Sequence, residues 1–221
     1  MDRITHAACQ AGRDPREVRL LAVSKTFPPE AVASLAACGQ RAFGENYVQE
    51  GVAKVQALQA LDLEWHFIGP IQSNKTRLVA EHFDWVHSVE RLKIAERLSA
   101  QRPEDRPPLK VLLQVNVSGE DSKSGCAPAE VPELARQLVA LPRLQLVGLM
   151  AIPEPTTDTV LLRQRFARLR ELREALALKG IDVPELSMGM SADLEVAIAE
   201  GASWVRVGSA LFGQHNKLPP A

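Results

Sequence analysis

The sequence predicts an α/β fold, a single-domain (β/α)8 TIM-like barrel. Short apolar runs alternate strictly with helical stretches, and this alternation predicts a parallel sheet with its helices outside. Eight such strand–helix units can be counted, which is the number that closes a barrel. The first strand is followed by Ser-Lys-Thr-Phe-Pro-Pro, whereas an open doubly wound sheet usually has a Gly-rich turn at that place.

The predicted strands are short apolar runs bounded by turn residues. The clearest is 109–117, whose nearly continuous apolar run is typical of a parallel strand covered on both faces. The other seven predicted strands, in chain order, are 19–24, 41–43, 64–68, 85–87, 144–150, 185–187 and 204–207.

The predicted helices carry apolar residues at helical spacing and have recognisable ends. Pro29 suits the first turn of the helix after strand 1, and Gly39 suits its end. Gly180 ends the longest helix. The predicted helices are 2–12, 29–37, 47–61, 73–82, 90–101, 129–141, 158–179, 192–200 and a short last one that Gly208 and Ser209 open.

Length and composition are consistent with one domain over residues 1–221. The chain has 221 residues, of which 46% are hydrophobic, enough for one sizeable core. Within this domain, residues 1–18 are expected to form a helix and a lead-in, and residues 214–221 a loose tail. No linker, repeat or low-complexity tract interrupts the chain.

Charge and cysteine usage exclude several classes of protein. Lys plus Arg number 26 and Asp plus Glu 27, so the basic excess of a nucleic-acid-binding protein is absent. Cys9, Cys38 and Cys126 are odd in number and far apart, as expected in a reducing compartment. No apolar run reaches the roughly 18 residues of a membrane span. We expect a cytoplasmic protein without a metal site and, since no exposed apolar stripe is evident, a monomer.

Lys25 ends the first apolar run, Leu-Leu-Ala-Val-Ser. Its stem would then lie in apolar surroundings and its amine above the sheet. Desolvation disfavours the ammonium form, and the neutral amine is the nucleophile that makes Schiff bases. The alternative is a lysine that extends from the strand end to water.

The carboxyl ends of barrel strands share one face, where the active sites of such barrels lie. Polar residues that are distant in sequence should therefore meet there. They are Lys25, Asn46, His66, Asn116, Ser187, Ser191 and Arg206. Of these candidates, His66 is expected to be a packing or surface histidine rather than a catalyst, as are His82 and His87.

The turns after the last two strands predict a phosphate site. Gly208 and Ser209 open a short helix whose backbone N–H groups can face a phosphate. The loop 188–191 adds a glycine and the hydroxyl of Ser191, and barrels often build phosphate sites from these two loops. The alternative is a barrel-closing turn that needs glycine for its geometry alone.

Lys25 and Arg206 lie on strands 1 and 8, which are neighbours in a closed barrel. An amine, an arginine and a phosphate cradle together suit a phosphorylated aldehyde, and pyridoxal 5'-phosphate (PLP) is the obvious candidate.

Six ordered blocks between about residues 20 and 213 closely resemble the pyridoxal phosphate homeostasis protein family, also called the proline synthase co-transcribed homologues. They are Leu-Ala-Val-Ser-Lys-Thr at 21–26, Phe-Gly-Glu-Asn-Tyr-Val-Gln-Glu at 43–50, Trp-His-Phe-Ile-Gly-Pro-Ile-Gln-Ser-Asn-Lys at 65–75, Gly-Leu-Met-Ala-Ile-Pro at 148–153, Leu-Ser-Met-Gly-Met-Ser at 186–191 and Val-Arg-Val-Gly-Ser-Ala-Leu-Phe-Gly at 205–213. Phe27 departs from the lysine often found there, and Ser209 replaces a common threonine.

The resemblance implies a fold-type III barrel like the N-terminal domain of alanine racemase, with PLP held as an aldimine on Lys25. It also implies that Arg206 faces the pyridine nitrogen and that Asn46 contacts the ring side. Ser191 and the N–H groups of Gly208 and Ser209 would hold the phosphate.

The sequence is compatible with three functions. The resemblance implies a carrier that takes part in intracellular PLP homeostasis without robust catalysis, with PLP-accepting apoenzymes as transient partners. The second is an amino-acid racemase or decarboxylase, and the third a phosphate-binding barrel enzyme without PLP. A racemase needs a base on each face of its substrate, and Tyr47 is the only tyrosine here. In the racemase this second base is a tyrosine from a β-rich domain, and we expect no such domain after the eighth strand–helix unit of this chain. We therefore expect the carrier function.

Overall fold

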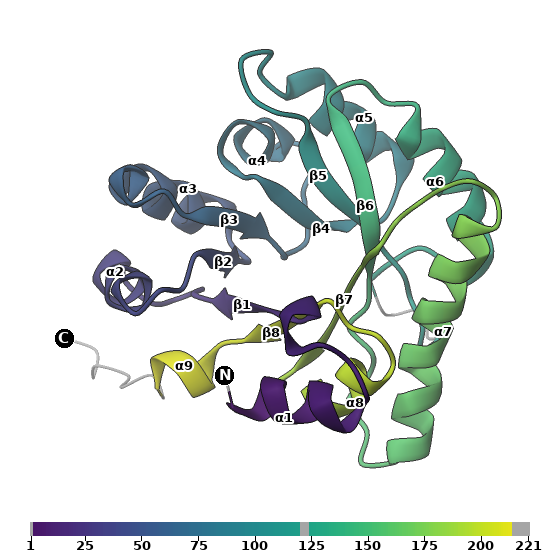
Figure 1. Ribbon diagram of the computed structural model, residues 1–221. Helices are drawn as coiled ribbons and strands as arrows, with labels where there is room; N and C mark the ends of the chain where they lie inside the picture. The colour runs from purple at the N-terminus through teal and green to yellow at the C-terminus, as the bar shows by residue number, and fades with distance from the viewer. Residues whose placement is uncertain (1, 120–123, 214–221) are drawn as a thin grey trace.

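The computed structural model describes residues 2–119 and 124–213, and it confirms the predicted barrel. Eight parallel strands close in chain order, with β1 paired to both β2 and β8 (Figure 1). The predicted tail at 214–221 lies outside the described residues. The strands are β1 (Arg19–Val23), β2 (Ala42–Glu45), β3 (Glu64–Phe67), β4 (Trp85–Val89), β5 (Leu109–Gln114), β6 (Leu144–Met150), β7 (Glu185–Met190) and β8 (Trp204–Val207).

The helices lie outside the barrel (Figure 1). They are α1 (Asp2–Gln10), α2 (Pro29–Ala37), α3 (Val48–Ala57), α4 (Thr76–His82), α5 (Leu92–Gln101), α6 (Val131–Val139), α7 (Thr159–Ala177), α8 (Leu194–Ala199) and α9 (Ser209–Phe212). Three short 3-10 helices are η1 (Pro15–Glu17), η2 (Gln59–Leu61) and η3 (Pro128–Glu130). Within the described part of the chain, no helix is long and apolar enough to cross a membrane.

Helix boundaries follow local chemistry. Asp158 caps α7, because its carboxylate accepts hydrogen bonds from the N–H groups of Val160 and Leu161 at 2.9 and 3.1 Å. The predicted helix 47–61 is interrupted: α3 ends at Ala57, and Asp62 adopts a left-handed conformation after the 3-10 turn η2. The predicted helix 129–141 likewise begins as the 3-10 turn η3.

Apolar side chains form two separate cores. The larger one fills the space between the strands and the surrounding helices. The smaller one lies inside the barrel and contains Leu21, Ala42, Ile68, Trp85, Leu112, Val147, Met150 and Trp204. Trp85 and Trp204 begin β4 and β8, so their rings, 5.5 Å apart, fill the amino end of the barrel. The carboxyl end is therefore the one left for a site.

Strand β7 is longer than predicted. The expected strand 185–187 extends to Met190, so most of the predicted loop 188–191 belongs to the sheet. Gly189 makes this possible: its φ is +95°, and a Cβ there would lie 2.6 Å from the Cβ of Ala197. The pairing of β7 with β8 shifts register between Ser187 and Met190. The turn that begins at Ser191 is therefore set by an irregular strand end.

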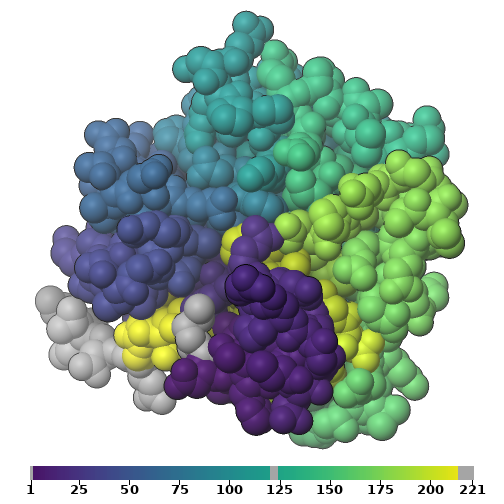
Figure 2. Space-filling model, in the orientation of Figure 1, coloured from purple at the N-terminus to yellow at the C-terminus, as the bar shows by residue number. Residues whose placement is uncertain are grey.

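Helix α1 packs against α8 (Figure 1), and on the face shown in Figure 2 the N-terminal residues, in purple, lie beside residues from the last part of the described chain, in yellow. Arg3 donates two hydrogen bonds to the carboxylate of Glu195, at 2.9 and 3.0 Å, and a third to the carbonyl oxygen of Ser191 at 2.9 Å. The first helix therefore contacts the turn that follows β7.

Candidate functional site

One cavity, of about 470 Å³, lies at the carboxyl ends of the strands. Five of the six predicted site residues line it: Lys25, Asn46, Ser191, Arg206 and Gly208. The sixth, Ser209, is the first residue of α9 and directly follows Gly208, but it does not line the cavity. The remaining lining residues are Val23, Ile68, Ile152, Met190 and Ala192. The cavity therefore combines an amine, a guanidinium and a hydroxyl with apolar walls.

Lys25 lies in a tight turn directly after β1. The N–H of Phe27 donates to the carbonyl oxygen of Ser24 at 3.1 Å, and Thr26 has a φ of +67°. A β-branched residue rarely adopts a positive φ, so neighbouring groups must hold this turn. Lys25 is exposed, and the expected apolar burial of its side chain is therefore wrong, because the turn lifts it off the sheet.

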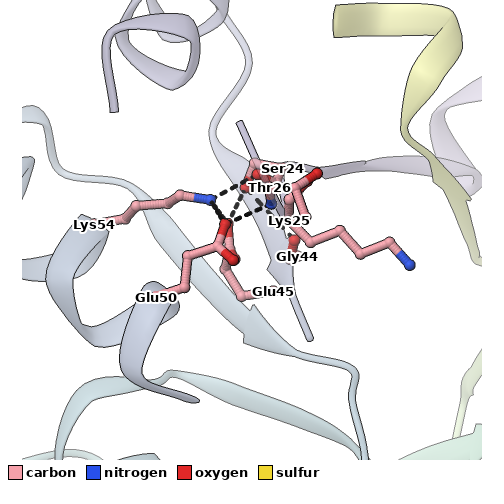
Figure 3. A network of polar contacts seen from close by, with 7 residues as sticks. All are labelled: Ser24, Lys25, Thr26, Gly44, Glu45, Glu50 and Lys54. Atoms are coloured by element: carbon pink, nitrogen blue, oxygen red, sulfur yellow. Dashed lines mark hydrogen bonds and ion pairs between the residues drawn. The ribbon is translucent and has the colours of Figure 1, made fainter. Parts of the chain in front are cut away.

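A buried polar cluster, which we call the Lys54 cluster, holds this turn from behind (Figure 3). It consists of Ser24, Glu45, Glu50 and Lys54. The Lys54 ammonium donates to the carbonyl oxygen of Ser24 at 2.6 Å and to the carboxylates of Glu45 and Glu50 at 2.8 and 2.6 Å. All three ammonium hydrogens therefore have acceptors. Lys25 extends away from the cluster, toward the other side of the turn.

Glu50 connects the Lys54 cluster to the strained residue of the turn. Its carboxylate accepts the N–H of Thr26 at 2.5 Å as well as the hydrogen bond from Lys54. This charged acceptor compensates for the unfavourable φ of Thr26. Sequence reasoning missed the cluster, although Glu50 and Lys54 are spaced i,i+4 on one helix, which is a recognisable signal.

Glu45 is fully buried at the centre of the Lys54 cluster. Burial raises the pKa of this carboxyl, and the hydrogen bonds from Lys54 and Ser24 partly offset that rise. Its Oε1 receives both bonds, the one from the Ser24 hydroxyl at 2.5 Å. Its Oε2 has no partner in the described structure, so Glu45 depends on Lys54 for its compensation.

Arg206 is buried in the floor of the cavity. Its Nη1 donates to the hydroxyl oxygen of Ser187 at 2.7 Å and its Nη2 to the carbonyl oxygen of Ala151 at 2.9 Å. It forms no ion pair with any residue that the structure describes. Burial lowers the pKa of Arg206 to about 10, against an opposing effect of Asp193, so the guanidinium is charged at neutral pH.

The two turns expected to hold a phosphate contribute Ser191 and Gly208 to the same cavity as Arg206. Ser191 is held by Arg3 through its carbonyl oxygen, and the preceding N–H of Met190 donates to Asp193 at 2.6 Å. Gly208 lies close to β1: a Cβ there would be 3.3 Å from the carbonyl oxygen of Val23. This close approach places the start of α9 beside the turn that carries Lys25.

Asn46 contributes an unsatisfied acceptor to the cavity. Its Oδ1 is buried and has no hydrogen-bond partner in the described structure. Buried polar atoms are normally satisfied, so a bound group with a donor fits this position. This orphaned oxygen, beside an amine and a guanidinium, is compatible with a ring that carries polar substituents.

Three other predicted polar residues are not in the cavity. His66 and Ser187 are buried inside the barrel, because their side chains point inward below the carboxyl face. Asn116 accepts hydrogen bonds from the N–H groups of Ser118 and Gly119 at 3.2 Å, and thus shapes its own loop. The sequence does not distinguish a side chain inside a strand from one at its carboxyl end, because the end of a predicted strand is uncertain by one or two residues.

The barrel and its cavity define a class of protein that comparison with known sequences identifies. The family model for the alanine racemase N-terminal domain matches residues 3–216. A protein of Pseudomonas aeruginosa named pyridoxal phosphate homeostasis protein is 63% identical over 219 residues, covering 99% of this chain and 94% of that protein. The protein of the same name from Escherichia coli K12 is 54% identical over 223 residues, covering 97% and 93%. The chain belongs to the pyridoxal phosphate homeostasis protein family.

A solved structure agrees with the sequence relatives. PipY of Synechococcus elongatus, determined with PLP bound, superposes with a TM-score of 0.83 at 40% sequence identity, covering 95% of this chain and 100% of that one.

Proposed function

We propose that this protein binds PLP in the cavity above Arg206, carries it on Lys25 as a Schiff base, and takes part in intracellular PLP homeostasis. The observation that carries the proposal is the joint placement of Lys25, Arg206 and Gly208 around one cavity. The names of its relatives and the PLP bound to PipY support the choice of ligand. Three free cysteines suit the reducing cytoplasm in which we place it.

Each lining residue has a role in the proposal. The Lys25 amine would attack the aldehyde carbon of PLP, a C=N bond would form, and water would leave. Arg206 would face the pyridine nitrogen, where a permanent cation disfavours protonation of the ring. Ser191 and the N–H groups of Gly208 and Ser209 would hold the phosphate. Asn46 would contact the side of the ring through its unsatisfied oxygen.

The arrangement favours a carrier over a racemase or decarboxylase. A racemase needs a second base opposite the lysine, and Tyr47, whose side chain is 55% exposed, lines a neighbouring cavity instead. Lys25 is itself exposed, so water reaches the site and carbanion chemistry is poorly protected. Turnover of alanine by the purified protein at ordinary enzymatic rates would contradict the carrier function.

The absorption spectrum of the purified protein with added PLP tests the binding proposal. A Schiff base with PLP absorbs visible light, and the band should vanish in Lys25→Ala. Lys75→Ala is the matched control, because Lys75 lines the neighbouring cavity and its removal should leave the band unchanged. A wild-type protein that stays colourless with PLP would instead favour a phosphate-binding enzyme without this cofactor.

Transient transfer of PLP to apoenzymes is part of the proposal, as is a monomeric state. Mixing the loaded protein with a PLP-free aminotransferase should restore activity faster than the same concentration of free PLP does, if transfer is direct. Equal rates would mean release into solution. Sedimentation should give the mass of one 24.2 kDa chain.

A further inference from the structure

Four consecutive hydrogen bonds cross the barrel interior from Arg206 to Glu64. The Arg206 Nη1 and Ser187 Oγ are 2.7 Å apart, and Ser187 Oγ is 2.8 Å from Nδ1 of His87. Nε2 of His87 is 2.8 Å from Nδ1 of His66, whose Nε2 is 2.9 Å from a carboxylate oxygen of Glu64. We call these five side chains the axial row. Its polar atoms form an unbroken path through an otherwise apolar core.

The axial row joins the two ends of the barrel. Arg206 lines the cavity at the carboxyl end, whereas Glu64 is the first residue of β3 and its side chain is 36% exposed at the amino end. Ser187, His87 and His66 are fully buried between them. The rings of Trp85 and Trp204 pack on His66, with their centroids 5.0 and 4.8 Å from that of the imidazole. These two indole rings therefore shield the axial row from water.

The two ends of the axial row fix the direction of its first and last hydrogen bonds. Arginine only donates and an ionised carboxylate only accepts. When both histidines are neutral, Ser187 accepts from Arg206 and offers its single hydrogen to Nδ1 of His87. His87 then carries its hydrogen on Nε2 and donates it to Nδ1 of His66, which donates from Nε2 to Glu64. Two neutral histidines in this row are therefore both Nε2–H tautomers.

Two other proton assignments preserve all four bonds, and the charges around the row oppose both. One places a second proton on His66 and reverses the two bonds between His66 and Ser187, and the other places a second proton on His87 and reverses only its bond with Ser187. Burial lowers the pKa of both histidines; Arg19 lowers both further, and Arg206 lowers that of His87. Glu64 and Asp84 act in the opposite direction on His66, but burial prevails.

We propose that His87 and His66 are positioning residues for Arg206: the axial row fixes the Ser187 hydroxyl so that its oxygen faces the guanidinium. Both acceptors of Arg206 are neutral, so their orientation must compensate for its buried charge. A hydroxyl that donates onward is a stronger acceptor, because aligned hydrogen bonds polarise one another. The consequence for PLP rests on the proposed function, in which Arg206 faces the ring nitrogen.

Nitrogen NMR of ¹⁵N-histidine-labelled protein without PLP tests the row directly. At pH 7 both His66 and His87 should be neutral with hydrogen on Nε2, assigned with His66→Gln and with His6→Asn as an exposed control on α1. An Nδ1–H tautomer at either position, or a doubly protonated His66 or His87, would overturn the assignment. Because no PLP is present, this result is independent of the proposed function.

A matched pair of variants at His87 tests the effect on the cavity. In His87→Asn the amide oxygen takes the place of Nδ1 and still accepts from Ser187, whereas in His87→Gln the amide takes the place of Nε2 and keeps only the contact with His66. We expect the PLP dissociation constant to stay within about threefold of wild type in the first and to rise about tenfold in the second.

Equal affinities in the two folded variants, or the reverse order, would refute the positioning role. Urea denaturation of both variants shows whether they are folded. If either variant is unfolded, the tautomers of His66 and His87 measured in the wild-type protein decide whether the proposal stands. Should wild-type protein bind no PLP, the proposed function fails while the NMR result still stands for the row.

Discussion

Lys54 donates a hydrogen bond of 2.6 Å to the main-chain carbonyl oxygen of Ser24, the residue before Lys25. A buried lysine on α3 thus positions the turn that presents an exposed lysine to the cavity. The Lys54 side chain is only 3% exposed, and its bonds to Glu45 and Glu50 fill its remaining donor positions. The chemistry proposed for Lys25 therefore depends on a polar cluster that does not line the cavity.

Lys54→Met should lower the free energy of unfolding by about 3 kcal/mol, because removing one partner of a buried ion pair leaves the other uncompensated. Glu45 would lose its cation, and Ser24 a donor to its carbonyl oxygen. Urea denaturation at pH 7 measures the loss.

The double variant Lys54→Met/Glu45→Gln provides the control for this cluster. It removes the buried charge as well as its partner, so it should be more stable than the single variant. A double variant that loses the sum of both single effects would show that the two side chains are not coupled.

Ser191→Ala should weaken the binding of PLP about tenfold, since a hydrogen bond to a charged group is lost. Pyridoxal, which lacks the phosphate, should bind the variant and the wild type equally. Titrations followed by absorbance give both affinities. A similar loss for both ligands would mean that Ser191 acts on the ring or on the fold instead.

Arg206→Leu should shift the pH dependence of the visible PLP band, because the cation beside the ring nitrogen is removed. The affinity for PLP should fall by about tenfold or more, because this variant removes the contact that His87→Gln only disturbs, whereas the phosphate contacts are made elsewhere. Arg206→Lys keeps the charge without the planar fork and should shift the titration less than leucine does. An unchanged titration in Arg206→Leu would remove Arg206 from the ring nitrogen.

Acid should destabilise the protein below about pH 6.5, the unperturbed value for histidine. The folded-state pKa values of His66 and His87 lie below it, so the unfolded chain binds more protons and stability falls as the pH falls. The expected slope is about 1.4 kcal/mol per pH unit for each histidine. A His66→Gln/His87→Asn variant should flatten this dependence, and His6→Asn should not.

A second acid step should follow from Glu64. Burial opposes its ionisation, but the hydrogen bond from His66 lowers the pKa of Glu64 to about 2 from an ordinary value of 4.5. The stabilisation is complete above about pH 4.5 and is lost as the pH falls toward 2. Glu64→Gln should remove this lower step in urea titrations and leave the step below pH 6.5 in place.

The barrel was predictable because its signals are local. Each strand is a short apolar run, each helix has its own periodicity and end signals, and their strict alternation restricts the topology. The errors were at the ends of elements: α3 ends earlier than predicted, and β7 continues through Gly189. Gly189 has a positive φ within β7 and lies close to Ala197 of α8. This contact between two elements is not visible in the local sequence pattern.

The sequence by itself determined the barrel and, through strand-end positions and the resemblance of six blocks, five of the residues that line its cavity. Only the tertiary structure showed that Lys25 is exposed, that Lys54 supports its turn, and that two histidines connect Arg206 to Glu64. The physical reason is that buried polar groups are compensated by partners across the core. His87 and Ser187 are 100 positions apart in the chain, and only the closed barrel brings them within hydrogen-bond distance.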